Sequence, residues 1–383
     1  MVGGGRGGYI GAIHRAAAIL DGHWELVAGA LSRSLERSRV SAADWHLDGD
    51  RAYSDFRRMA EIESGRPDRP DAIVVCTTNE THFDVATVFL DAGFNVICEK
   101  PLAIRREEAW SLVDLAKRKQ AIFAVGHCYS GYPMVRLAKG MIASGELGEV
   151  RSVIVEYASQ YGAERGYSMP WLDDPERSGP SGVLAGTGTH AHHLCEFVTG
   201  LRVEEVSADL AALVPGHVLE DHATMHLRFV NGARGLLWNT SIAVGNENGL
   251  SIRVFGSQGG LRWHQENPNI LEFSPLNRAK RTLTRGGFDT SAANKDWERV
   301  PYGHPEGYQE AYANLYTEIA EAILDREAGK PAPAEGYLFP TVTDGARGVD
   351  FVFAALESSS NNAAFTKLGP PQAKAATDRE ISA

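Results

Sequence analysis

The chain has 383 residues, with 38 Lys or Arg against 49 Asp or Glu, so its formal net charge is −11. This balance argues against nucleic acid or an anionic membrane as the main partner, because both need basic surface. No apolar run approaches the roughly 18 residues of a membrane helix, and no basic segment leads into an apolar stretch, so we expect a cytoplasmic protein without a membrane partner. The four cysteines lack the spacing of zinc sites or disulfide frameworks, which predicts free thiols at Cys76, Cys98, Cys128 and Cys195.

Up to about residue 126, short β-rich apolar runs alternate with amphipathic helical stretches. In the stretch Glu107–Lys119, for example, Ala109, Leu112, Val113 and Ala116 share one face. The expected strands are Glu25–Leu31, Ala72–Cys76, Asn95–Cys98 and Ala121–Val125. This alternation predicts an α/β domain with a doubly wound parallel sheet and right-handed crossovers over residues 1–126.

The second part of the chain has strands with a period of two, separated by turn signals such as Asn231-Gly232 and Gly259-Gly260. The expected strands are Ser152–Ala158, His222–Phe229, Gly235–Ile242 and Leu250–Phe255. They predict a mostly antiparallel sheet with fewer helices, hence an α+β domain over residues 127–368.

Three further segments complete the expected organisation. A long helix is predicted from about Glu306 to Asp325, and the Gly/Asn/Arg-rich stretch 276–299 is predicted to be a surface loop. The segment 369–383, rich in Ala and with mixed charge, is predicted to be a flexible tail.

A glycine-rich turn opens the chain, where Gly3, Gly5 and Gly8 form the pattern G-x-G-x-x-G and Gly11 follows. In a dinucleotide-binding turn the first glycine allows a tight bend and the second lets the backbone approach the pyrophosphate. The third lets the helix pack closely on the strand, and here either Gly8 or Gly11 could do so. The helix N-terminus then offers free N–H groups to the phosphates.

The end of the second expected strand bears on the choice between NAD and NADP. An acidic residue there would bind the ribose hydroxyls of NAD, but the strand ends with Ser32 and Arg33. These side chains could hold a 2′-phosphate, which would favour NADP. A solvated Arg33 is an equally good interpretation, so the choice between NAD and NADP stays open.

Two further motifs follow in the same half of the chain. The strand ending at Cys76 continues into Thr77-Thr78-Asn79-Glu80-Thr81-His82, and the next strand ends in Glu99-Lys100-Pro101. With the glycine turn in front, these segments resemble the glucose-fructose oxidoreductase/inositol dehydrogenase/rhizopine catabolism (Gfo/Idh/MocA) family. Further matches to that family are Gly126-His127-Cys128-Tyr129, Gly145-Glu146-Leu147-Gly148, Gly188-Thr189-His190 and His304-Pro305-Glu306-Gly307-Tyr308.

The resemblance implies an N-terminal Rossmann domain that carries NAD(P), and a C-terminal domain with an open sheet that often mediates oligomers. We therefore expect a homo-oligomer, either a dimer or a tetramer. The predicted cofactor-binding residues are Gly3, Gly5, Gly8, Tyr9, Ile10, Ser32, Arg33, Thr77, Thr78, Asn79, His82, Glu99 and Lys100.

Two positions match the catalytic residues of the family. The resemblance implies that Lys100 lies beside the nicotinamide and the reacting hydroxyl, where an amine can exchange a proton. It implies that His190 holds the substrate hydroxyl or carries its proton, since imidazole titrates near neutral pH. The nearby His192 and His193 lack ligand spacing with an acidic residue, so we expect no metal.

The chain departs from the family pattern at one position. The family usually has an aspartate four residues before the catalytic histidine, and here that position is Gly186. The Lys-Asp-His arrangement is therefore incomplete. Thr187, Tyr129 or a group of the substrate could substitute for the carboxylate, or the chemistry could differ.

Aromatic faces suit the C–H face of a pyranose, and His, Arg and Tyr tips suit its hydroxyls. The predicted substrate-binding residues are Tyr129, Tyr132, Tyr157, Trp171, Arg177, His193, His304 and Tyr308. Arg177 could bind an anionic group or form a loop salt bridge.

Three functions are compatible with these residues. The first is an NAD(P)-dependent oxidoreductase acting on a hydroxyl of a sugar, polyol or glycoside. The second is an NAD-dependent glycosidase, similar to the NAD-dependent sulfoquinovosidases, that oxidises C3 transiently and eliminates the aglycone. The third, a dinucleotide-binding sensor without catalysis, is disfavoured because Lys100 and His190 occur together.

Overall fold

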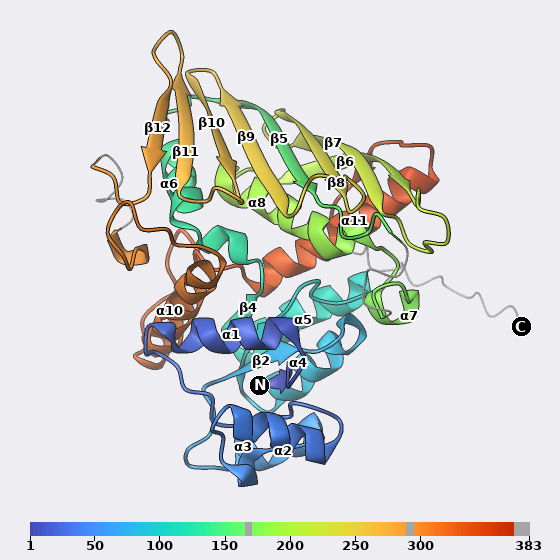
Figure 1. Ribbon diagram of the computed structural model, residues 1–383, viewed down its shortest axis with the longest axis vertical. Coiled ribbons are helices and arrows are strands. Elements are labelled where there is room, and N and C mark those ends of the chain that lie inside the picture. Colours follow the sequence, from blue (N-terminus) through green and yellow to red (C-terminus); the bar gives the residue numbers. More distant parts are fainter. Residues whose placement is uncertain (165–170, 289–294, 371–383) are drawn as a thin grey trace, which may run out of the picture.

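The computed structural model describes residues 1–164, 171–288 and 295–370, and it contains two sheets with helices between and around them (Figure 1). The smaller sheet has four parallel strands in the order β1-β2-β3-β4. These strands are β1 (Val2–Gly3), β2 (Ala72–Cys76), β3 (Asn95–Cys98) and β4 (Phe123–Val125). The helices of this part are α1 (Tyr9–Leu20), α2 (Leu35–Asp44), α3 (Phe56–Ser64), α4 (His82–Asp91) and α5 (Arg106–Lys119). The predicted parallel sheet with alternating helices is confirmed.

The expected strand Glu25–Leu31 is wrong in its extent. Only Gly29 and Ala30 form isolated bridges, to Ala52 and Val2. The physical reason lies in the neighbouring β1, which offers two residues and therefore cannot template a longer ladder.

The larger sheet has nine strands in the order β12-β11-β10-β9-β5-β8-β7-β6-β13. All neighbours are antiparallel except β5 and β8, which are parallel. The strands are β5 (Val150–Ala158), β6 (Val203–Ala211), β7 (His222–Phe229), β8 (Arg234–Thr240), β9 (Gly249–Gly256), β10 (Gly259–His264), β11 (Ile270–Pro275), β12 (Arg281–Thr284) and β13 (Thr366–Lys367). The expected mostly antiparallel sheet is confirmed.

Two details of the second part differ from expectation. The stretch 276–299 is only partly a loop, because Arg281–Thr284 pairs with β11; residues 289–294 lie outside the described structure. Gly259-Gly260 begins β10 and does not form the turn before it, because both glycines pair across the sheet with β11.

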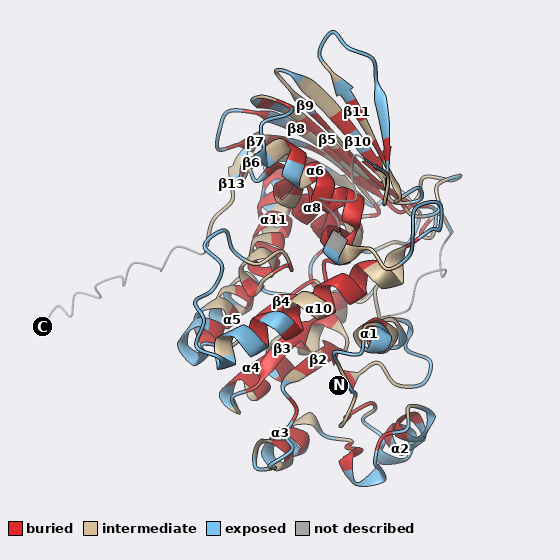
Figure 2. Ribbon diagram, turned by 90° about the vertical axis from the view of Figure 1, so that its left-hand side faces the viewer, coloured by how far each residue is buried: buried red, intermediate tan, exposed pale blue. Residues whose placement is uncertain are grey.

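Helices cover one face of the larger sheet and separate it from the smaller one (Figures 1 and 2). They are α6 (Pro133–Ala143), α8 (Thr189–Thr199) and α11 (Val342–Ser360), with the short α7 (Pro175–Ser178) at the side, while α10 (Tyr308–Glu327) packs against α1. The predicted helix Glu306–Asp325 corresponds to α10. A π-helical turn, Leu184–Gly188, leads directly into α8. Its position decides the geometry of the candidate site, because it contains Gly186.

The inner face of the larger sheet and α8 form one continuous apolar core. Alternate residues of β5, such as Val153 and Val155, are fully buried against Leu194 and Val198 of α8. A second core surrounds the parallel sheet. Among the described residues, no helix is long and apolar enough to cross a membrane.

Candidate active site and dinucleotide site

The glycine turn packs directly against α1. Gly3 and Gly4 have φ of +76° and +69°, a conformation that side chains rarely adopt. A Cβ on Gly11 would lie 2.4 Å from the Cα of Gly4, whereas Gly8 precedes the helix as its N-cap with φ of −87°. Gly11 is therefore the glycine that lets this helix approach the loop, which resolves the alternative left open by the sequence.

The residues at this turn fit a dinucleotide. A Cβ on Gly5 would lie 2.5 Å from the carbonyl oxygen of Leu31, so the loop and the strand end are in close backbone contact. Beside them, the Oγ1 of Thr77 is buried without a hydrogen-bond partner among the described residues, as expected for a group that a ligand completes. Ser32 and Arg33 follow Leu31 on the surface, and the Ser32 Oγ accepts a hydrogen bond from the Ser34 amide.

Tyr9 and Ile10 begin α1, whereas the other predicted cofactor residues, Thr77, Thr78, Asn79, His82, Glu99 and Lys100, follow the carboxyl ends of β2 and β3, where ligands of doubly wound sheets bind. The buried ring of His82 contacts the carbonyl oxygens of Pro101, at 2.8 Å, and Thr77, at 3.1 Å, and thereby joins the two motifs. Burial lowers the pKa of His82, and the two carbonyl oxygens partly oppose this effect. Asn79 donates to the Ser178 carbonyl at 3.0 Å, while Tyr9, at the start of α1, is exposed.

Glu99 of the Glu-Lys-Pro segment forms a buried ion pair with His14. Glu99 Oε1 is 2.8 Å from His14 Nε2 and accepts a hydrogen bond of 2.8 Å from the hydroxyl of Tyr312. Burial alone would raise the pKa of Glu99, but His14, Lys100 and Tyr312 lower it to about 2. Burial would likewise lower the pKa of His14, yet its neighbours Cys76, Tyr316 and Glu99 raise it well above 6.5.

Lys100 is tied to the position where the family has its aspartate. Its Nζ donates a hydrogen bond of 2.8 Å to the carbonyl oxygen of Gly186, in the π-helical turn that precedes α8. His190 follows four residues later and is buried. The Gly186 carbonyl thus accepts a hydrogen bond from Lys100, but unlike a carboxylate it brings no negative charge.

Charge around His190 is correspondingly unbalanced. Burial and the charge of Lys100 lower the pKa of His190 well below 6.5, and the opposing effect of Glu99 does not compensate. The His190 Nδ1 lies 3.4 Å from the Nδ1 of His127, and the His127 ring stacks on His193 with centroids 4.7 Å apart. Burial and the neighbouring histidines also lower the pKa of His127, so these rings are neutral at pH 7.

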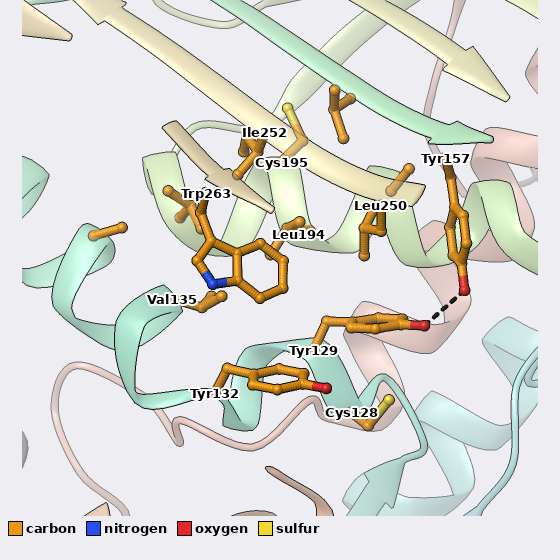
Figure 3. Packing of buried hydrophobic residues seen from close by; sticks show 14 of the residues in the cluster. Cys128, Tyr129, Tyr132, Val135, Tyr157, Leu194, Cys195, Leu250, Ile252 and Trp263 are labelled. Carbon is orange, nitrogen blue, oxygen red and sulfur yellow. Dashed lines mark hydrogen bonds between the residues drawn. The ribbon is translucent and has the colours of Figure 1, made fainter. Parts of the chain in front are cut away.

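Tyrosine side chains lie beside these histidines. The Tyr129 and Tyr157 hydroxyls are 2.6 Å apart (Figure 3). The Tyr157 hydroxyl also donates to the Asn248 Oδ1 at 2.7 Å. The Tyr129 ring lies edge-on to His190 with centroids 4.9 Å apart, and Tyr308 lies 6.3 Å from Tyr129.

The other predicted substrate residues have different surroundings, although the ring of Tyr132 stacks on that of Tyr129 with centroids 6.2 Å apart. Tyr132 is 2% exposed and packs against Trp263 in the apolar core (Figure 3). His304 is exposed in a surface loop, and Trp171 is half-buried. Arg177 forms an ion pair with Glu80 at 3.4 Å, which agrees with the alternative of a loop salt bridge.

His193 also lines a separate cavity of about 980 Å³ together with Arg202, Asp344 and the segment 330–341. Its spacing of three residues from His190 puts the two histidines on the same face of α8, and both rings contact the ring of His127. The assigned roles of all these residues stay predictions.

Several residues that the fold brings to the candidate active site were not predicted from the sequence. They are His14, His127, Tyr161, Asn248 and Tyr312. His127 lies inside a quoted motif, and Tyr312 is one helical turn after Tyr308, so both had a local signal. Tyr161 and Asn248 had none, because their neighbours are distant in sequence.

The architecture and the glycine turn define an NAD-binding oxidoreductase fold. Residues 1–127 match the model of the oxidoreductase family with an NAD-binding Rossmann fold, and residues 135–262 match the GFO/IDH/MocA C-terminal domain. The chain therefore belongs to the Gfo/Idh/MocA family and is an NAD(P)-dependent oxidoreductase.

Individual relatives agree with this assignment. The chain is 30% identical to an uncharacterized oxidoreductase, YfiI, of Bacillus subtilis, with 96% of each chain covered. It is 35% identical, with a TM-score of 0.90 and 96% of each chain covered, to an inositol dehydrogenase homologue from Azotobacter vinelandii solved with NADH and myo-inositol. Levoglucosan dehydrogenase of Pseudarthrobacter phenanthrenivorans is 27% identical over 72% of this chain and 77% of its own.

Proposed function

We propose that this protein is a dehydrogenase that oxidises a hydroxyl of a sugar, polyol or glycoside with NAD(P)⁺. The observation that carries the proposal is the bond between Lys100 Nζ and the Gly186 carbonyl, which holds the amine at the carboxyl end of β3 and one turn before His190. This end of a doubly wound sheet is where the nicotinamide of a bound dinucleotide supplies a hydride acceptor. The names of the relatives support a sugar or polyol as substrate.

The protein's own residues divide the proton chemistry between them. Lys100 takes the proton of the substrate hydroxyl as the carbinol carbon loses its hydride. His190 is neutral, and its Nδ1 is directed to His127, so its Nε2 is left to orient the same hydroxyl. Glu99 is held by His14 and Tyr312 and positions the backbone that carries Lys100.

Substitution of Lys100 tests this assignment. Lys100→Ala should lower kcat by about 10²–10⁴-fold, the range of a positioned acid or base, while the Kd for the dinucleotide stays within a few fold. Lys117→Ala, on the exposed side of α5, is the matched control and should behave as wild type. Wild-type turnover by Lys100→Ala would remove Lys100 from the mechanism.

The absence of a carboxylate at Gly186 keeps the redox-neutral glycosidase as a second candidate. A dehydrogenase releases one NAD(P)H per substrate oxidised, so absorbance at 340 nm rises with product. The glycosidase would return its hydride, release the aglycone and exchange the C2 proton with solvent. Aryl glycosides monitored for phenol and NAD(P)H together distinguish them, and phenol release far exceeding NAD(P)H would establish the glycosidase.

We also propose that the outer face of the larger sheet forms a homo-oligomer interface. The helices lie on the opposite face, and Phe255 on β9 is 42% exposed beside the half-buried Ile154, Leu236 and Trp238. An apolar patch on an open sheet is typical of an interface. Light scattering should give a dimer or tetramer, and Trp238→Lys should dissociate it; a wild-type monomer would refute the interface.

A further inference from the structure

Open space lies beside Gly186, the position at which the family has an aspartate, and this space is next to Lys100. A Cβ built on Gly186 would meet a single atom of the described structure within 4 Å outside its own helix, the hydroxyl oxygen of Tyr161 at 3.9 Å. The φ of Gly186 is not positive, so the backbone itself does not require glycine here. Neighbouring glycines differ, because a Cβ on Gly182 or Gly188 would collide with atoms 2.4–2.6 Å away.

Hydrogen-bond donors border this space. Lys100 uses one N–H for the Gly186 carbonyl and, as the neutral amine that can take a proton, has one more. The Tyr161 hydroxyl makes no hydrogen bond to any residue that the structure describes. Burial and the nearby charge of Glu220 raise the pKa of Tyr161 to about 12, so at neutral pH the hydroxyl keeps its proton and can donate it.

Among the described residues, the carboxylates near Lys100 and Tyr161 already have partners. Glu99 is paired with His14 and bonded to Tyr312. Glu220 is the carboxylate next to Tyr161, and its Oε1 already accepts hydrogen bonds from the Ser181 hydroxyl and two backbone amides at the start of the helical segment. A bound oxidised nicotinamide would add positive charge beside Lys100, which favours an anionic group of the substrate in this space.

We propose that this space is a subsite for a carboxylate of the substrate, bound by the Tyr161 hydroxyl and by an N–H of Lys100, whose lone pair is left for the proton of the reacting hydroxyl. The substrate would thus be a polyhydroxy acid, such as an aldonate or uronate, whose own carboxylate supplies the charge that an aspartate side chain supplies elsewhere in the family. The inference rests on the dehydrogenase function proposed above and narrows its substrate class. A carboxylate is chosen because the missing group is itself a carboxylate on a short stem.

Matched pairs of compounds test the substrate class. D-gluconate differs from D-glucitol, and D-glucuronate from D-glucose, by a carboxylate in place of a hydroxymethyl group. Wild-type protein should show at least a 10-fold higher kcat/KM for the acid in one of the pairs. D-gluconate or D-glucuronate should also raise the Tm of the protein without added dinucleotide, whereas the neutral partner should not.

Three variants at Gly186 separate charge from volume. Gly186→Ala adds only a Cβ into open space and should fold and retain the acid preference. Gly186→Asn and Gly186→Asp fill the same volume, but only the latter carries a charge. The kcat/KM for the acid should therefore be about 10-fold lower in the Asp than in the Asn variant, because like charges would face each other. The kcat/KM for the neutral partner should not be lower in the Asp variant.

Tyr161→Phe provides an independent measurement. Loss of the donor should raise KM for the acid about 5–10-fold with a smaller change in kcat, and leave the dinucleotide Kd unchanged. Equal kcat/KM for acid and neutral partners in wild type, with equal acid rates in the Asp and Asn variants, would overturn the subsite while leaving the dehydrogenase function intact. If no compound reduces NAD(P)⁺, the proposed function is in question, and the Tm shift by the acid and its loss in Gly186→Asp still decide the subsite.

Discussion

Returning a carboxylate to position 186 should change the ionisation of the candidate catalytic histidine. Gly186 is four residues before His190, and such positions are neighbours along a helical surface. The open space beside Gly186 means that an aspartate can enter without displacing a neighbour. At present burial and Lys100 hold the pKa of His190 well below 6.5, and a carboxylate would oppose both effects.

The size of the effect follows from the spacing. Two unit charges about 6 Å apart at an effective dielectric constant of about 20 interact by roughly 3 kcal/mol. Since 1.4 kcal/mol corresponds to one pKa unit, the upper limit is about two units, and partial screening by Lys100 reduces this to about one. Gly186→Asp should therefore raise the pKa of His190, and the acidic limb of the pH–rate profile should move towards neutrality by about one to two units.

The assay is the pH dependence of kcat/KM with the best neutral substrate of the wild-type protein. Gly186→Asn is the matched control, because it has the same size and no charge, and its acidic limb should stay at the wild-type position. If the Asp and Asn variants share one acidic limb, position 186 does not act electrostatically on His190 and the geometric reasoning is refuted.

Three other predictions concern the cofactor, the glycine turn and the buried ion pair. If Arg33 holds a 2′-phosphate, wild type should bind NADP more tightly than NAD and Arg33→Ala should erase the difference in titrations; equal wild-type affinities would mean a solvated side chain. Gly11→Ala should cost about 1–3 kcal/mol in urea unfolding through its backbone collision, whereas Gly140→Ala, with nothing within 4 Å, should be neutral or slightly stabilising. Glu99→Gln should lower the free energy of unfolding most between about pH 4.5 and 6.5. Because the pKa of Glu99 is lowered, its contribution to stability is lost as pH falls from 4.5 to about 2, and because the pKa of His14 is raised, its contribution is lost as pH rises beyond 6.5. A loss of stability that does not depend on pH would show that the pair is not ionised.

The local sequence determined the two sheets and the position of the glycine turn. Hydrophobic periodicity is a property of neighbouring residues, so β2, β3, α5 and β7 were found close to their observed bounds. It did not identify β12 or the long α11, and it extended the strand before Ser32, because the partner strand that limits a ladder is not visible in a local pattern.

What only the tertiary structure decided is the environment of each candidate side chain. The sequence marked Gly186 as a departure, but only the packing of the π-helical turn against the Glu-Lys-Pro segment places its carbonyl on Lys100. His190 and His193 both contact the ring of His127, and only the fold shows that His193 lines a separate cavity as well. Contacts between segments more than 200 residues apart, such as Tyr312 with Glu99, depend on how the two sheets are joined, and no local pattern encodes that arrangement.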